Sequence, residues 1–115
     1  MTNQKTIGFI GQRIAEEYLK NEGCKILQKN FHIRGGEIDL IALQKNELVF
    51  VEVKTRTDFR IVENEILHSH QIRALKRTAM KYLRQKPHSL WRFDLITVTI
   101  EHARKAHIKH LMNIF

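Results

Sequence analysis

A glutamate and a lysine stand two positions apart in the stretch 47–56, which has the clearest β-strand character in the chain. Side chains two positions apart on a strand point to the same face, so Glu52 and Lys54 are expected to project together. A tight connection at 45–46 predicts an antiparallel hairpin with the preceding strand. The register of that hairpin places Asp39 directly opposite Glu52.

Two opposed carboxylates repel each other unless a cation lies between them. Asp39 and Glu52 offer the hard oxygen ligands that Mg²⁺ (or Mn²⁺) binds together with water and a substrate phosphate. A metal held there would polarise a phosphoryl oxygen, and Lys54 would orient the attacking water or offset charge in the transition state. A solvated strand face with an ordinary Glu–Lys pair explains the same spacing, so both interpretations stay open.

The charge of the chain favours a polyanionic partner. In 115 residues, 20 Lys and Arg stand against 12 Asp and Glu, and the formal net charge is +8. Residues 1–63 hold 10 basic and 9 acidic side chains, whereas residues 64–115 hold 10 basic and only 3 acidic ones. We therefore expect a polyanionic partner, either nucleic acid or an anionic membrane surface. Nucleic acid is favoured because the apolar stripe of the second predicted helix is modest and is needed for the core.

The composition narrows the class of protein further. Cys24 is the single cysteine, which excludes an internal disulfide and fits a reducing cytoplasm. Residues 1–5 lack the apolar region of a signal peptide, and the longest apolar-rich stretch, 93–100, is too short to span a bilayer. The length and the scarcity of proline and glycine predict that residues 1–115 form one domain.

The apolar pattern predicts helices alternating with strands. Helices are expected over 4–22, capped by Asn3, and over 69–85, capped by Ser69. Strands are expected over 24–33, 37–43, 47–56, 90–100 and 106–112, and a loop over 57–67. The order α-β-β-β-α-β(-β) predicts an α/β fold with a mixed central sheet flanked by helices.

Each predicted helix carries a feature that bears on binding. Gly8 and Gly11 are unusual inside a helix and indicate close packing against the sheet or close approach of a ligand. One face of the second helix gathers Arg73, Lys76, Arg77, Lys81 and Arg84. We expect this face to contact phosphates, although an ordinary solvated helix face is the alternative. The arginines expected to extend it are Arg34, Arg56, Arg60 and Arg92.

Other reactive or aromatic side chains show no spacing typical of a site. We expect Cys24 to be a buried thiol and Trp91 to lie in the core, with stacking on a nucleic-acid base as the alternative for Trp91. The histidines without metal-ligand spacing, which are expected at the surface, are His102, His107 and His110.

Two longer motifs surround the acidic residues. GGEIDLIA at 35–42 is followed by VFVEVKTR at 49–56, and the chain also carries RFD at 92–94 and NIF at 113–115. With these motifs the chain resembles the YraN-like family of small bacterial proteins, which is assigned to the PD-(D/E)XK nuclease superfamily. The resemblance implies a restriction-endonuclease-like fold, a Mg²⁺-dependent nuclease acting on DNA rather than RNA, and the pairing of two copies as a homodimer.

The resemblance also implies roles for single residues. The residues that it assigns to the nuclease site are Asp39, Glu52, Lys54 and Gln71. Asp39 and Glu52 are implied to bind the metal, and Lys54 to be the catalytic lysine. Where the family has a glutamate in the first helix, this chain has Gln12, which weakens the expected metal site unless Glu16 substitutes. This departure keeps a second interpretation open, a nucleic-acid-binding protein whose nuclease site is weak or inactive.

Overall fold

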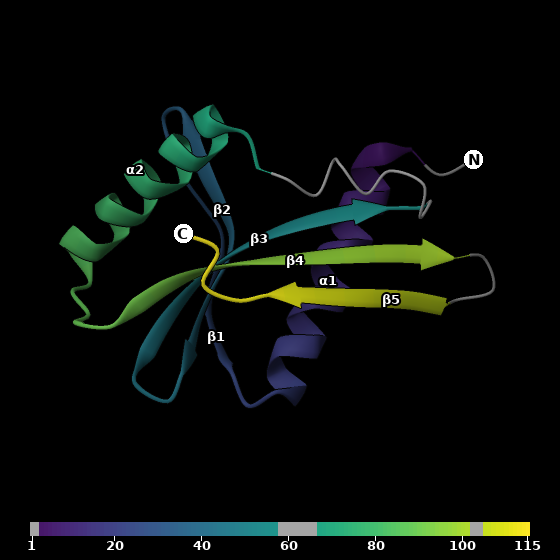
Figure 1. Ribbon diagram of the computed structural model, residues 1–115, viewed down its shortest axis with the longest axis horizontal. Coiled ribbons are helices and arrows are strands. Elements are labelled where there is room, and N and C mark those ends of the chain that lie inside the picture. The colour runs from purple at the N-terminus through teal and green to yellow at the C-terminus, as the bar shows by residue number, and fades with distance from the viewer. Residues whose placement is uncertain (1–2, 58–66, 102–104) are drawn as a thin grey trace.

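A five-stranded mixed sheet lies between two helices in the computed structural model (Figure 1). The structure describes residues 3–57, 67–101 and 105–115. The elements are, in chain order, α1 (Gln4–Asn21), β1 (Lys25–Ile33), β2 (Gly36–Gln44), β3 (Glu47–Arg56), α2 (Ser69–Gln85), β4 (Trp91–Glu101) and β5 (Lys105–Leu111). The predicted α/β fold and element order are confirmed, with the fifth strand present. The predicted loop over 57–67 lies mostly outside the described residues, as do Arg60 and His102.

The strands follow the order β1-β2-β3-β4-β5 across the sheet. Three neighbouring pairs are antiparallel, and β3 and β4 are parallel. A parallel pair needs a crossover connection, and the segment that contains α2 supplies it. Among the described residues, no helix is long and apolar enough to cross a membrane.

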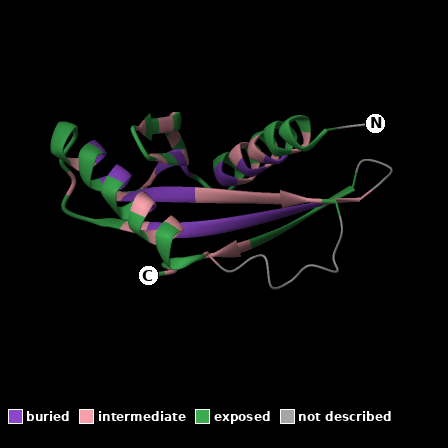
Figure 2. Cartoon of the chain, turned by 90° about the horizontal axis from the view of Figure 1, so that it is seen from above, coloured by how far each residue is buried: buried purple, intermediate pink, exposed green. Residues whose placement is uncertain are grey.

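The central strands of the sheet are largely buried (Figure 2). Their side chains enter two hydrophobic layers. Beneath α1 the buried residues are Ala15, Leu19, Cys24, Leu40, Ala42, Val49, Val51, Ile96 and Val98. Beneath α2 they are Ile38, Ile41, Leu48, Phe50, Leu75, Ala79, Tyr82 and Phe93. Because neighbouring strand residues belong to different layers, the two helices cover opposite faces of the sheet.

The helix starts differ in one detail from the prediction. Asn3 caps α1, because its side-chain oxygen accepts a hydrogen bond from the N–H of Thr6 at 2.8 Å. The prediction that Ser69 caps α2 is wrong, since His68 occupies the cap position and Ser69 is already helical. Oε1 of Gln71 accepts the N–H of His68 at 2.9 Å, which satisfies the cap backbone from inside the first turn.

β2 and β3 pair over only part of their length. The predicted hairpin register is confirmed from Gln44–Glu47 to Leu40–Val51. Beyond Val51, β3 pairs with β4 alone, whereas β2 continues its pairing with β1. The two strands separate at this point, which we call the fork. It brings Asp39 and Glu52 just past the last paired residues.

Candidate functional site

Asp39 and Glu52 meet at the fork. Oδ2 of Asp39 accepts a hydrogen bond from the backbone N–H of Val53 at 2.8 Å, so this side chain replaces the strand partner that β2 no longer provides. The carboxyl groups of Asp39 and Glu52 also share a side-chain hydrogen bond. The two acids expected to be opposite each other are therefore in contact.

The acid pair has little positive charge to balance it. Nζ of Lys54 lies 3.9 Å from Oε2 of Glu52. Burial raises the pKa of Asp39, and the hydrogen bond from the Val53 N–H offsets this only in part. Burial and then the neighbouring Asp39 raise the pKa of Glu52 to about 9. The pair therefore retains a proton at neutral pH, because two adjacent carboxyls cannot both ionise there without a cation.

A groove of about 890 Å³ opens beside the acid pair. It runs between the N-terminal half of α1 and the end of β3, and we call it the α1–β3 groove. Asp39 and Lys54 line it from the strands, and Gln12 lines it from the helix. Arg56 and Lys5 add two further cations to its wall. The acid pair is thus reached through a polar groove that carries three basic side chains.

The two glycines of α1 have different surroundings. A Cβ atom at Gly11 would collide with the side chain of Thr55, so α1 can approach β3 this closely only with glycine there. The close-packing interpretation is therefore confirmed for Gly11, and this contact brings the next residue, Gln12, to the groove. A Cβ atom at Gly8 would meet nothing within 4 Å, and Gly8 lines the groove.

Two residues expected near the acids lie elsewhere. The carboxylate of Glu16 is 3.0 Å from Nζ of Lys20 and 3.4 Å from Nζ of Lys29. The hydrogen bond from Lys20 is the main cause that lowers the pKa of Glu16, and Glu16 lines a separate hollow of about 650 Å³. Gln71 is engaged with the His68 backbone and does not line the groove. The structure therefore brings Gln12, but neither Glu16 nor Gln71, to the groove.

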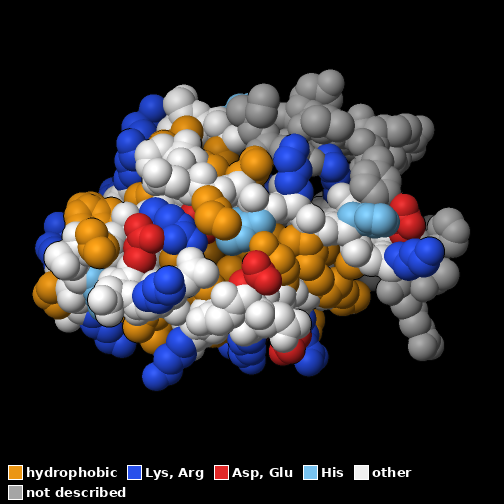
Figure 3. Space-filling view, turned by 60° about the horizontal axis from the view of Figure 1, so that its bottom comes forward, with side chains coloured by type: hydrophobic (Ala, Val, Ile, Leu, Met, Phe, Trp, Pro, Cys, Tyr) orange, Lys and Arg blue, Asp and Glu red, His pale blue; other side chains and the backbone are white. Residues whose placement is uncertain are grey.

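The predicted cationic face of α2 is exposed and lies outside the groove. Its residues are Arg73, Lys76, Arg77, Lys81 and Arg84. Arg77 also donates to the carbonyl oxygen of Gly35 at 3.0 Å, beside the exposed Arg34 in the β1–β2 turn. On the face drawn in Figure 3, blue Lys and Arg side chains are spread around the outline and red acidic ones are few. The basic charge is therefore distributed widely instead of being confined to one helix.

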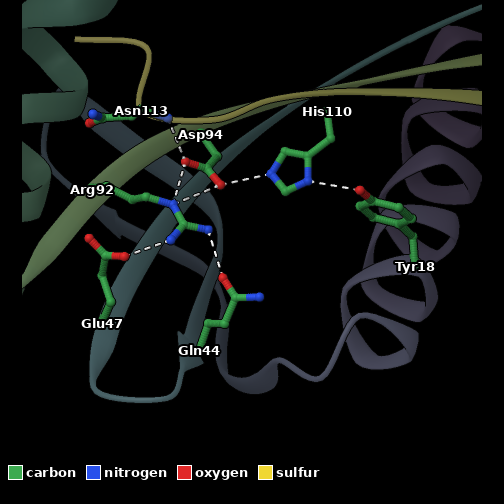
Figure 4. A network of polar contacts seen from close by, with 7 residues as sticks. All are labelled: Tyr18, Gln44, Glu47, Arg92, Asp94, His110 and Asn113. Carbon is green, nitrogen blue, oxygen red and sulfur yellow. Dashed lines mark hydrogen bonds and ion pairs between the residues drawn. The ribbon is translucent and has the colours of Figure 1, made fainter.

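A second carboxylate centre was not predicted from the sequence. It consists of Tyr18, Gln44, Glu47, Arg92, Asp94, His110 and Asn113, and we call it the Asp94 network (Figure 4). The Asp94 side chain is fully buried and accepts hydrogen bonds from Nε of Arg92 at 3.0 Å and from Nε2 of His110 at 2.7 Å. The backbone N–H of Asn113 donates to the same carboxylate at 3.0 Å.

Three expectations for β4 and β5 are wrong. Arg92 was expected at a phosphate-binding surface, but its side chain is only 13% exposed and also pairs with Glu47 at 2.7 Å. His110 was expected at the surface, but β5 pairs it with Ile96 of β4, and its side chain is 9% exposed. Trp91 was expected in the core but is 41% exposed at the first position of β4. Cys24, in contrast, is buried as expected.

The fold and the site define a small α/β protein with a largely buried acid pair beside a polar groove, which is lined by three basic side chains and also by Glu37. Comparisons with known proteins place it in a family. Residues 11–98 match the uncharacterised protein family UPF0102, and this span contains both strand motifs. The chain belongs to this family, in agreement with its resemblance to YraN-like proteins.

Relatives match the chain over nearly its whole length. A UPF0102 protein of Caldanaerobacter subterraneus subsp. tengcongensis is 41% identical over 98% of this chain and 97% of its own length. A UPF0102 protein of Syntrophomonas wolfei is 37% identical over 96% of this chain and 98% of its own length. A UPF0102 protein of Alkaliphilus oremlandii is 38% identical over 96% of this chain and 98% of its own length.

Proposed function

We propose that this protein is a metal-dependent nuclease of the PD-(D/E)XK type that hydrolyses phosphodiester bonds of nucleic acid, DNA rather than RNA. The observation that carries the proposal is the contact between Asp39 and Glu52, with Lys54 beside them at the wall of a groove. Carboxyls with strongly raised pKa values beside a groove are a common mark of a functional site.

The donor set fits a hard divalent cation. Mg²⁺ is usually bound by one or two carboxylates and keeps several waters as well as substrate phosphate oxygens. Asp39 and Glu52 would hold it, and the side-chain carbonyl of Gln12 offers a further oxygen in the same groove. The metal would supply Lewis-acid polarisation of the phosphoryl group and a more acidic water. It would also take the place of the proton that the two acids share.

The basic side chains of the groove complete this interpretation. Lys54 is 33% exposed and lies close enough to Glu52 to offset negative charge that develops on the phosphate. Lys5 and Arg56 would hold the flanking phosphates of the strand. The exposed cations of α2 would contact phosphates outside the groove.

A second candidate function is nucleic-acid binding without cleavage. Gln12 stands where an acid would strengthen the metal site, and among the described residues no group of three or more His, Cys, Asp or Glu side chains is arranged to hold a metal ion. Two carboxylates alone would then bind metal weakly, while the basic groove would still attract nucleic acid.

Calorimetric titration with Mn²⁺, combined with cleavage assays, tests the proposal. We expect the wild type to bind Mn²⁺, Asp39→Asn to lose binding, and Glu16→Gln, which removes an acid that lies outside the groove, to retain it as a control. Asp39→Asn and Lys54→Ala should each lower cleavage at least about 100-fold, because each removes a group placed to act on the reacting phosphate.

The variant Gln12→Glu separates the two candidate functions. Tighter Mn²⁺ binding by this variant, together with metal-dependent cleavage by the wild type, supports the nuclease. Wild-type protein that binds nucleic acid but cleaves only after Gln12→Glu supports the weakened site. If neither the wild type nor Gln12→Glu binds Mn²⁺, the proposal of a metal site at Asp39 and Glu52 is wrong.

A further inference from the structure

We infer that the α1–β3 groove holds an unpaired strand of nucleic acid and that the ring of Phe9 stacks on one of its bases. This inference rests on the proposed function in one respect, namely that nucleic acid is the ligand of the groove. It adds the substrate class, which consists of single strands and of duplexes with unpaired segments. It also adds a residue, Phe9, that selects for these substrates.

Phe9 is placed unusually for a large apolar side chain. Its side chain lies outside both hydrophobic layers, and the residue is 63% exposed, although α1 buries other apolar residues such as Leu19 completely. Among the described residues, its ring stacks on no other aromatic ring. One exposed apolar residue is ordinary by itself. What singles out Phe9 is that it lines the groove that also contains Asp39 and Lys54.

The surroundings of Phe9 match what single-stranded nucleic acid requires. Proteins that bind single strands combine a basic groove, which follows the backbone, with aromatic rings on which bases stack. Lys5 lies one helical turn before Phe9, and Lys54 and Arg56 lie on the strand wall. Gly8, the neighbour of Phe9, leaves the groove open, because no atom lies within 4 Å of a Cβ placed there. A strand can therefore run past the cations while one base turns towards the ring.

The depth of the acid pair favours an unpaired strand over a duplex. The Glu52 side chain is only 19% exposed, and of the two acids it is Asp39 that lines the groove, so a reacting phosphate must enter the groove to reach the pair. The groove, about 890 Å³, has the size of sites that enclose small ligands, which suits a short stretch of single strand. In a duplex both faces of a base are covered by its neighbours, so stacking on Phe9 requires a base that has left the helix.

The other exposed aromatic residues do not share this position. Phe115 stacks on Phe93 with ring centres 4.7 Å apart and lies under Nζ of Lys76. Trp91 is 41% exposed and does not line the groove. Trp91 therefore provides a matched control, an exposed aromatic ring on the same protein but away from the acid pair.

The first experiment measures binding without metal, in EDTA, by fluorescence anisotropy. The probes are a labelled DNA single strand, the blunt duplex of the same sequence, and a forked duplex with unpaired arms. We expect the wild type to bind the single strand and the forked duplex about tenfold more tightly than the blunt duplex. Phe9→Ala should weaken binding of the single strand by between about fivefold and 100-fold, while duplex binding stays unchanged. Phe9→Tyr should restore the single-strand affinity, and Trp91→Ala should leave it unaltered.

The second experiment detects stacking directly. Phe9→Trp in a Trp91→Phe background leaves one indole in the protein, at the groove. An oligothymidylate should quench its fluorescence, and the same oligonucleotide should cause little quenching of Trp91 in the wild type. Absence of quenching at saturating oligonucleotide overturns the stacking inference.

The outcomes separate this inference from the nuclease proposal. Loss of single-strand affinity in Phe9→Ala, without cleavage by the wild type in Mg²⁺ or Mn²⁺, supports the stacking site and contradicts the nuclease. Metal-dependent cleavage with equal single-strand affinity in the wild type and Phe9→Ala contradicts the stacking site and supports the nuclease. A wild type that binds the blunt duplex most tightly also overturns the inference.

Discussion

Two carboxylate centres lie along the same helix, and they are neutralised very differently. Tyr18, in the C-terminal half of α1, reaches the Asp94 network through a 2.9 Å contact with His110. Gln12, six residues earlier, lines the groove beside Asp39. Asp94 receives a guanidinium, an imidazole and a backbone N–H, whereas Asp39 receives one backbone N–H and another carboxyl group.

The pKa values express this difference. Burial disfavours the ionised form of Asp94, but the hydrogen bonds from His110 and Arg92 outweigh burial and lower its pKa. Burial acts in the same direction on Asp39 and Glu52, where it prevails and raises both pKa values. The contacts of the Asp94 network therefore stabilise the ionised carboxylate inside the folded protein. The acid pair is left short of positive charge, which is the arrangement expected where a ligand completes the site.

The largest effect is expected from Asp94→Ala. It leaves Arg92, which is 13% exposed, without its buried partner. We expect the free energy of unfolding to fall by about 3–5 kcal/mol, measured by urea denaturation at pH 7. Glu47→Gln, which removes a partner that is 36% exposed, should cost below about 1 kcal/mol. Equal losses in the two variants would show that burial does not distinguish the partners of Arg92.

Glu52→Gln is expected to raise the free energy of unfolding, by less than Asp94→Ala lowers it. Because the pKa of Glu52 rises from 4.5 to about 9 on folding, the folded protein holds a proton that the unfolded chain releases between these values. Wild-type stability should therefore decline as the pH rises through this window, and the variant should be about 1–3 kcal/mol more stable than the wild type at pH 9.

Urea denaturation at pH 5, 7 and 9 measures this difference. Glu16→Gln is the control, since the pKa of Glu16 is lowered in the folded protein and its removal should give no gain at pH 9. Parallel curves for the wild type and Glu52→Gln across this range would contradict the raised pKa of the acid pair.

The smallest effects concern the helix that joins the two regions. Tyr18→Phe removes the 2.9 Å contact with His110 and should lower stability by about 1 kcal/mol. Gly8→Ala, at the groove, should instead raise it by up to about 1 kcal/mol, because the added methyl group meets no atom and favours the helix. Thermal denaturation of both variants checks the signs. Higher stability of Tyr18→Phe, or lower stability of Gly8→Ala, would contradict the expectation that α1 is held by a polar contact at Tyr18 and is open at Gly8.

The sequence predicted the elements well because local signals define them. The bounds of the helices and strands agree with the predictions within about two residues. The two-residue connection at 45–46 determined the hairpin register, since Gln44 pairs with Glu47 across it. From this local geometry it followed that Asp39 and Glu52 come close together, although the fork that joins their side chains could not be foreseen.

The Asp94 network was missed because its members come from distant parts of the chain. Tyr18, Arg92 and His110 belong to three different elements, and their contacts depend on the pairing of β5 with β4. One signal was present in the sequence. Asp94 interrupts the apolar run 93–96, and a charged residue in a buried strand requires a buried partner.

The groove was predicted only in part. Asp39 and Lys54 could be assigned from the two strands, and Gln12 from the resemblance to the family. Arg56 was expected to extend the basic face of the second helix, but it lines the groove. Phe9 was overlooked because the apolar periodicity of a helix does not reveal which apolar positions the sheet leaves uncovered. That depends on how far α1 extends past the strands beneath it.

The fork creates an edge strand inside the sheet. Beyond Val51, one side of β3 has no neighbouring strand among the described residues, and the Val53 N–H bonds to Asp39 instead. Open strand edges recruit strands from other molecules, and charged side chains are a common protection against this. Lys54 and Arg56 stand on this segment. The cations proposed to bind substrate also suit this protective role, and neutralising both is expected to favour edge-to-edge aggregation.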